Sequence, residues 1–248
     1  YSIFDCKKGG EVVMRIKNLN FAYGEKVIFK DLNMDLPPNG VTCIMGGSGA
    51  GKTTLLNCIS RQLCFDGNIE YDSDGASFAY VFQQTRLIPS MSVEDNIKFV
   101  LPKSISKEQI DVRVNDIIDK LQLEECRNSY PSRISGGQAG RAALARALVT
   151  DCDILLMDEP FKGLDVKLKK DILDLLVPLI KQKSVIFVTH DVEEALAIAD
   201  RVFVFERKEN SCVRVKGQID IRQIQSDRDI YGEHLNRVRK EIYDLLTQ

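Results

Sequence analysis

Residues 46–54 read GGSGAGKTT. Gly46, Gly51, Lys52 and Thr53 fit the phosphate-binding pattern G-x-x-x-x-G-K-S/T. The apolar run VTCIM precedes this loop, and TTLLNCISRQL, whose apolar residues recur at helical spacing, continues from it. A strand, a glycine-rich loop and a helix in this order predict backbone N–H groups that face a polyphosphate. The alternative is a glycine-rich turn that matches by chance, and the flanking strand and helix disfavour it.

The side chains of the loop indicate what it binds. Lys52 is expected to place its charge between the β- and γ-phosphates of a nucleotide, and the Thr53 hydroxyl is expected in the shell of Mg²⁺. The other candidates for nucleotide contacts are the remaining loop residues, Gly46, Gly47, Ser48, Gly49, Ala50, Gly51 and Thr54. The loop therefore predicts a nucleotide-binding site with Mg²⁺.

Two carboxylates follow a second apolar run. CDILLMDEP at 152–160 predicts a buried strand over 154–157 that ends in Asp158 and Glu159. Open α/β sheets bind ligands at the carboxyl ends of their strands. Asp158 suits a water-mediated contact to Mg²⁺, and Glu159 suits a general base for an attacking water. Two acids after a strand are more often a solvated strand end, but the phosphate loop in the same chain favours the catalytic interpretation.

A third apolar run, 185–188, ends in Thr189 and His190. One of only two histidines in the chain thus follows a predicted core strand, as Asp158 does. We expect His190 to contact the γ-phosphate, although a lone histidine is usually a structural or surface residue. His234 lies in a polar C-terminal segment, and we expect no catalytic role for it.

With these residues in place, the chain resembles the ATP-binding subunit of an ABC (ATP-binding cassette) transporter over residues 12–215. The resemblance implies ATP as the nucleotide. It also implies further site residues. Tyr23 in NFAYGEK would stack on adenine, and Gln83 in AYVFQQ would contact Mg²⁺. Ser135, Gly136, Gly137 and Gln138 in ISGGQ would form the family signature, and Asp165 in KGLD would communicate across a dimer. Ile134 replaces the usual leucine of the signature, and Lys162 and Gly163 replace common small residues.

Each carried-over residue has a structural alternative. Tyr23 is also compatible with a strand-end aromatic, because Gly24 indicates a turn. Gln83 is compatible with surface polarity, and Gln84 lies beside it. Ser135 is a preferred helix N-cap. For Ser135 the N-cap role and the signature role are not exclusive, because a helix N-terminus offered to phosphate is the chemistry that the family uses.

The resemblance also implies partners. Two copies, expected to be identical, would sandwich each ATP between the phosphate loop of one and the signature of the other. A transmembrane permease and, for an importer, a solute-binding protein would complete the assembly. The implied location is cytoplasmic, at the inner face of the membrane. The segment TRLIPSMSVEDNI at 85–97 would receive the permease or simply cap the helical lobe, with Leu87 and Met91 as candidate contacts.

The sequence segments VFQQTRLIPSMSVEDNI and DEPF are most similar to those of importers of the nitrate, sulfonate and taurine group. An importer of a small anionic or organic solute is therefore the leading hypothesis. An exporter or envelope-remodelling ATPase, or a soluble ABC ATPase acting on nucleic acid or ribosomes, is the alternative. The balanced charge, with 34 Lys plus Arg against 36 Asp plus Glu, disfavours a nucleic-acid partner.

Composition sets further expectations. No apolar run reaches the roughly twenty residues of a membrane helix, and no basic-then-apolar leader opens the chain, although the missing Met allows an upstream start. The seven cysteines, with Cys43 in a core strand and Cys58 in an apolar helix, predict buried thiols in a reducing compartment. They show no zinc-binding spacing.

The predicted fold class is α/β, a P-loop NTPase with a RecA-like, mainly parallel sheet core. One ATP-binding domain is expected, with a core at 1–84 and 151–225, an inserted α-helical lobe at 85–150 and a C-terminal helix at 226–248. Segments 12–16, 27–29 and 32–36 predict an antiparallel β-subdomain. Ser106 with Gln109 predicts a capping box before a helix whose apolar stripe is Ile110, Val114, Ile117, Ile118 and Leu121. Ile230, Leu235, Val238, Ile242 and Leu245 predict an amphipathic C-terminal helix.

Overall fold

A computed structural model describes residues 14–37, 39–71, 76–180, 183–208, 211–221 and 233–247. The chain divides into two compact units. The first comprises Tyr1–Ser77 and Lys181–Gln248, and the second comprises Phe78–Ile180.

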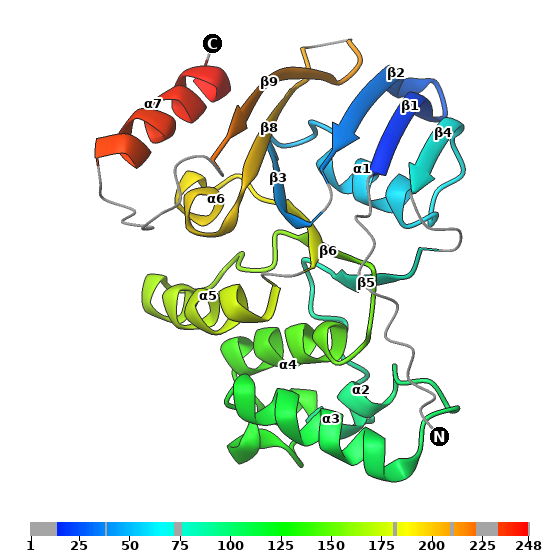
Figure 1. Cartoon of the computed structure of the whole chain (residues 1–248), viewed down its shortest axis with the longest axis vertical. Coiled ribbons are helices and arrows are strands. Elements are labelled where there is room, and N and C mark those ends of the chain that lie inside the picture. The colour runs from blue at the N-terminus through cyan, green and yellow to red at the C-terminus, as the bar shows by residue number, and fades with distance from the viewer. Residues whose placement is uncertain are drawn as a thin grey trace. The chain divides into compact units, whose positions relative to one another are not determined.

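The first unit contains an antiparallel sheet with the strand order β2-β1-β4 (Figure 1). Its strands are β1 (Met14–Tyr23), β2 (Lys26–Leu36) and β4 (Asp66–Tyr71). The predicted antiparallel subdomain is thus confirmed, although the two segments expected at 27–29 and 32–36 form one continuous strand. Register shifts along the β1–β2 pair, near Asn18 and Asp31 with φ of 48° and 51°, interrupt the alternation of buried and exposed residues.

The same unit holds four further strands in the order β7-β3-β8-β9. Strands β3 (Gly40–Gly46), β7 (Ser184–Val188) and β8 (Arg201–Glu206) are parallel, and β9 (Arg214–Asp220) is antiparallel to β8. Buried residues run almost without interruption along the parallel strands, as in a sheet covered on both faces. Its helices are α1 (Lys52–Ile59), α6 (Val192–Ile198) and α7 (Glu233–Thr247).

Helix α7 packs on α6, β8 and β9 (Figure 1). Leu235, Val238 and Ile242 are buried, as the amphipathic pattern predicts. Leu245 lies over Gly217, where an added Cβ would come within 2.7 Å of its Cδ1. The expected start of this helix and Ile230 lie outside the described residues.

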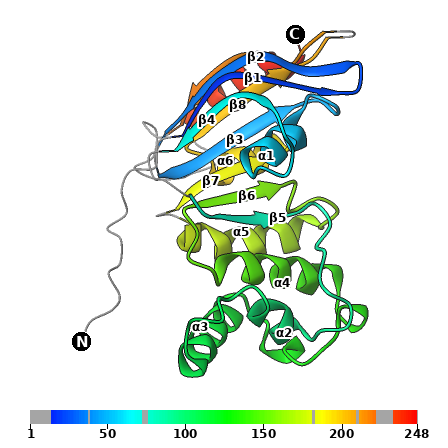
Figure 2. The ribbon, with the colours of Figure 1, turned by 90° about the vertical axis from the view of Figure 1, so that its right-hand side faces the viewer.

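The second unit contains the parallel strands β5 (Phe78–Val81) and β6 (Ile154–Asp158), paired from Phe78↔Ile154 to Val81↔Met157. Its helices are α2 (Val93–Lys98), α3 (Lys107–Lys120), α4 (Gly136–Leu148) and α5 (Val166–Ile180), with 3₁₀ turns at Glu124–Cys126 and Pro131–Arg133. Helices α2, α3 and α4 pack together (Figure 2). The predicted capping box of α3 is confirmed, with Ser106 and Gln109 exchanging both hydrogen bonds.

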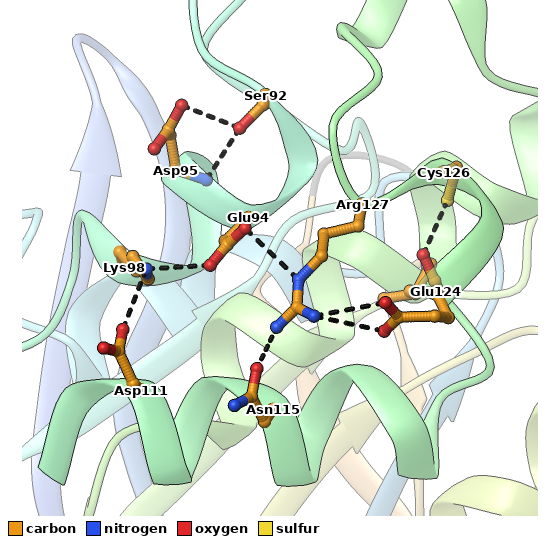
Figure 3. Close-up of polar contacts among 10 residues, drawn as sticks. Ser92, Glu94, Asp95, Lys98, Asp111, Asn115, Glu124, Cys126 and Arg127 are labelled. Carbon is orange, nitrogen blue, oxygen red and sulfur yellow. Dashed lines mark hydrogen bonds and ion pairs between the residues drawn. The ribbon is translucent and has the colours of Figure 1, made fainter. Parts of the chain in front are cut away.

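A network of charges joins α2, α3 and the turn at 124–126 (Figure 3). Arg127 Nε lies 3.2 Å from Glu94 Oε2, its Nη1 bonds Glu124 at 3.1 Å, and its Nη2 donates to Asn115. Lys98 bridges Glu94 at 2.8 Å and Asp111 at 3.0 Å. Hydrogen bonding to Glu94 raises the pKa of Lys98. Because Glu94 and Arg127 are mostly shielded, these contacts fix the angle between helices more firmly than surface pairs would.

Among the described helices, none combines the length and the apolar character that a membrane crossing requires. Cys43 and Cys58 are both 0% exposed, which confirms the prediction of buried thiols. Cys64 is exposed.

The difference in exposure between Cys64 and the two buried thiols predicts selective alkylation. Burial raises the pKa of Cys58 to about 12 and raises that of Cys43 well above its ordinary value. A raised pKa keeps the neutral thiol, so at pH 8 a much smaller fraction of each buried cysteine than usual is the reactive thiolate. In the native protein, iodoacetamide is expected to modify Cys64 and to spare both buried thiols, as measured by peptide mass spectrometry. Denaturant should equalise the three rates; equal rates in the native protein would contradict the prediction.

Candidate nucleotide-binding site

The predicted phosphate loop lies between β3 and α1 in the first unit. Lys52 is 7% exposed, and its Nζ donates to the carbonyls of Gly46 and Gly47 at 2.8 and 2.9 Å. The ammonium is thus held at the mouth of the loop by groups that a phosphate oxygen can replace. Helix α1 begins at Lys52, and its first turn, Lys52-Thr53-Thr54, carries no acid to oppose an anion.

Two glycines of the loop are required by packing. At Gly46, with φ of 150°, an added Cβ would lie 2.5 Å from the carbonyl oxygen of Phe205 on β8. At Gly51, with φ of 77°, it would lie 2.9 Å from Val213 Cγ2 and 3.2 Å from Ile28 Cγ2. The two glycines of the motif therefore let the loop lie directly against its neighbouring strands.

The other loop residues divide by exposure. Gly47, Ser48, Gly49 and Thr53 are exposed, whereas Ala50 and Thr54 are buried. An exposed Thr53 hydroxyl beside Lys52 fits a Mg²⁺ ligand, and Thr54 belongs to the core. No group of three or more His, Cys, Asp or Glu within the described ranges could hold a metal by itself.

A pocket of about 810 Å³ opens beside the loop. Ser48 and Gly49 line it together with Lys26, Val27, Arg207 and Lys208. Arg207 fixes this wall, because it donates to the carbonyls of Val27 and Ser211, both at 3.0 Å. The volume of the pocket suits a nucleotide-sized ligand. Four basic residues and one acidic residue line the pocket, which suits an anion.

Tyr23 ends β1 and is 51% exposed. Its ring and that of Phe21 form a T-shaped pair, with ring centroids 4.8 Å apart. Both the strand-end and the base-stacking interpretations are compatible with this geometry, and the second stays a prediction.

His190 is exposed at the end of β7, next to a buried polar contact. Thr189 is buried, its N–H donates to Ile44 of β3 at 3.3 Å, and its hydroxyl bonds Glu194 at 2.6 Å. Glu194 is 4% exposed in α6. The strand that leads to the phosphate loop and the segment that carries His190 are therefore joined. Glu194 was missed from the sequence; an acid four residues after His190 on a helix gave no signal of burial.

In the second unit, parallel strands bring Gln83, Asp158 and Glu159 to one edge. Val81 pairs with Met157; Asp158 comes next after that pair, and Gln83 and Glu159 each lie two residues beyond it. Asp158 is 5% exposed within β6, so the predicted strand extends one residue further than expected. Burial raises the pKa of Tyr80 and the negative charge of Asp158 raises it further, which places that charge beside β5. Gln83 is exposed two residues beyond the strand.

The segment after Gln83 is tied to helix α4. Arg146 donates to the carbonyls of Thr85 and Arg86 at 2.9 and 2.8 Å, and burial lowers its pKa. The Arg86 guanidinium lies 4.0 Å over the Phe82 ring. The sequence did not single out Arg146, because its partners are backbone atoms sixty residues away. Leu87 is buried, so only Met91 of the two candidate permease contacts offers appreciable surface.

The signature residues begin α4. Ser135 caps this helix, with Gln138 N donating to its Oγ at 3.2 Å, while Gln138 Oε1 accepts from Ser135 N at 2.9 Å. The N-cap interpretation of Ser135 is thus confirmed. Gly136 is exposed and has open space around it, whereas Gly137 packs on Leu168 of α5. Asp165 Oδ1 accepts from Leu168 N at 3.0 Å, so it caps the start of α5.

The chain is similar to curated proteins over most of its length. A family model described as "ABC transporter" matches residues 29–162. The Fe(3+) ions import ATP-binding protein FbpC of Fusobacterium nucleatum is 34% identical over 239 residues, which cover 91% of this chain and 61% of that protein. The sulfate/thiosulfate import ATP-binding protein CysA of Acinetobacter baylyi is 37% identical over 234 residues, covering 88% and 63%. The spermidine/putrescine import ATP-binding protein PotA of Haemophilus ducreyi is 36% identical over 206 residues, covering 78% and 56%. The chain thus spans about three fifths of the length of these curated relatives.

Two solved structures share the fold. The structure of cbiO1 from Clostridium perfringens, part of the ABC transporter complex cbiONQ, has a TM-score of 0.75 and 25% identity, covering 94% of this chain and 100% of that one. The dimeric post-hydrolysis structure of the ATP-binding cassette MJ0796, bound to ADP and Pi, has a TM-score of 0.70 and 29% identity, covering 84% and 98%. The predicted fold class is therefore confirmed.

Proposed function

Because the chain belongs to the ABC transporter family, we propose that it binds and hydrolyses ATP to power the transport of a solute across a membrane. The observation that carries this proposal is the buried Lys52 ammonium, held at the mouth of a glycine loop whose Gly46 and Gly51 admit no side chain. In this proposal the whole chain forms one ATP-binding domain.

The residues divide the chemistry between binding and proton transfer. Loop amides and Lys52 bind the β- and γ-phosphates, and Tyr23 stacks on adenine. Thr53, Gln83 and Asp158 would hold Mg²⁺, which neutralises charge on the phosphates when it is bound. Glu159 accepts a proton from the attacking water as the water oxygen bonds to the γ-phosphorus. The bond from that phosphorus to the bridging oxygen breaks, and ADP and phosphate are released.

His190 and the signature act on the γ-phosphate in this proposal. The signature, Ser135–Gln138, comes from a second copy of the chain, so that each ATP is sandwiched between two subunits. The dimeric structure of the similar cassette MJ0796 supports this arrangement. In this arrangement the N-terminus of α4, which Ser135 and Gln138 cap, faces the phosphate. Closure on ATP and reopening after hydrolysis supply the mechanical step, and Asp165 relays it between subunits.

A permease subunit and a solute-binding protein are the proposed partners, with the chain at the cytoplasmic face of the membrane. The names of the relatives, all import ATP-binding proteins, favour import. Their named solutes, which are iron, sulfate or thiosulfate, and polyamines, differ in charge and size. Similarity therefore supports the direction of transport more strongly than the small anionic or organic solute that the sequence suggested.

The test is to capture the Glu159→Gln chain with ATP from detergent-solubilised membranes of its source, and to identify co-purifying proteins by mass spectrometry. A polytopic membrane protein is expected, and a solute-binding protein with it would establish import. Recovery of only soluble or ribosomal partners would reject transport and favour the soluble ATPase. A parallel capture with Lys52→Ala, which should not close on ATP, separates ATP-dependent partners from background.

A further inference from the structure

The turn after β6 brings a lysine onto the proposed general base. Glu159 has φ of 43°, a conformation that side chains other than glycine rarely adopt. Lys162 N donates to the Glu159 carbonyl at 3.1 Å, which closes a tight turn. As a result, Lys162 Nζ lies 2.9 Å from Glu159 Oε2.

The two partners differ in their exposure to water. The Glu159 side chain is 14% exposed, and its Oε2 is almost completely shielded, whereas the Lys162 side chain is 50% exposed. The ammonium of a half-exposed side chain therefore contacts a carboxylate oxygen that is shielded from water. Withdrawal of Lys162 into water is expected to cost little, because half of its side chain is already solvated.

An exposed pair of this kind would usually be a surface contact of small consequence. Here the carboxylate is shielded from water, so water screens the attraction only weakly. The shielded residue, Glu159, is also the one that must take up a proton. An ammonium held against a carboxylate opposes proton uptake by that carboxylate. It also occupies an oxygen to which the attacking water would donate.

We propose that Lys162 is a restraining residue for ATP hydrolysis, which holds Glu159 in an ion pair and slows proton transfer until the lysine withdraws. This inference rests on the proposed role of Glu159 as the general base. Lys162 stands where the resemblance led us to expect a small residue, so the restraint belongs to this chain rather than to the shared machinery. The reaction itself is unchanged: the water proton still passes to Glu159, and ADP and phosphate still leave.

The first test is Lys162→Met, which keeps the stem and removes the charge. The kcat for ATP hydrolysis is expected to rise about three- to tenfold at an unchanged KM, in keeping with Brønsted behaviour of a general base. Lys162→Arg should restore the wild-type rate. Lys167→Met is the matched control, since Lys167 is exposed two residues into α5 and forms no ion pair with the described residues. An unchanged or lower kcat for Lys162→Met would overturn the restraint.

A second measurement does not depend on activity. Acylation of Lys162 by an amine-reactive ester, followed by peptide mass spectrometry, should be several-fold slower than that of Lys167 in the wild-type chain. In Glu159→Gln the two rates should converge; similar rates already in wild type would overturn the ion pair. If Glu159→Gln hydrolyses ATP at the wild-type rate, the proposed role of Glu159 as general base is rejected. If Glu159→Gln is inactive but Lys162→Met has the wild-type rate, only the restraining role of Lys162 is rejected.

Discussion

Glu159→Gln is expected to reduce steady-state ATP hydrolysis by about 10²- to 10⁴-fold, the usual loss when a general base is removed. The amide has nearly the same shape as the carboxylate but cannot accept the proton of the attacking water. Because this role assigns Glu159 to the attacking water and not to the binding of the phosphates, ATP binding should remain. Phosphate release measures the first effect, and binding of a fluorescent ATP analogue measures the second.

The amount of dimer that accumulates is a second measurement for Glu159→Gln. A chain that binds ATP without hydrolysing it should stay closed on a second copy. Size-exclusion chromatography with ATP and Mg²⁺ should show this species. Glu125→Gln, an exposed acid of the same unit, is the control and should behave as wild type. Turnover at the wild-type rate in Glu159→Gln would remove this residue from the role of base.

Lys52→Ala is expected to weaken ATP binding about ten- to a hundredfold, equivalent to about 1.4–2.8 kcal/mol. The side chain is buried and already aligned by the Gly46 and Gly47 carbonyls, so little ordering is required when phosphate binds. Its loss removes a charge-assisted contact to the ligand. Isothermal titration with ATP gives the affinity directly.

The control for this variant is Lys17→Ala, which removes an exposed lysine of the same unit that pairs with Glu70 at 2.8 Å. Thermal melting must also be compared, because Lys52 bridges two loop carbonyls in the folded chain. Wild-type affinity in a folded Lys52→Ala protein would show that the loop binds its ligand through the backbone alone.

Much of the fold followed from local patterns. Ser106 with Gln109 and Ser135 with Gln138 form capping boxes because each requires only residues three positions apart. The apolar runs 154–157 and 185–188 form buried strands for an equally local reason, since a parallel strand is covered on both faces. The segments predicted at 27–29 and 32–36 both form strand, but they belong to one strand that continues through Asp31 with its positive φ.

The candidate site was predictable only in part. The phosphate loop, Asp158, Glu159 and His190 are marked by short motifs, and their roles stay predictions. Glu194 and Arg146 are not marked, and Lys162 is visible only as a departure from the common small residue. The first is buried through its bond to Thr189, and the second bonds backbone carbonyls distant in sequence.

By itself, the sequence determined the family, the strands that lead to the candidate site, and the residues expected to carry the candidate chemistry, because these depend on side-chain type and spacing within short segments. Only the tertiary structure decided which of these residues are shielded, which glycines admit no side chain, and that Lys162 reaches Glu159. Those properties depend on φ angles and on neighbours that come together when the chain folds, so no local pattern encodes them.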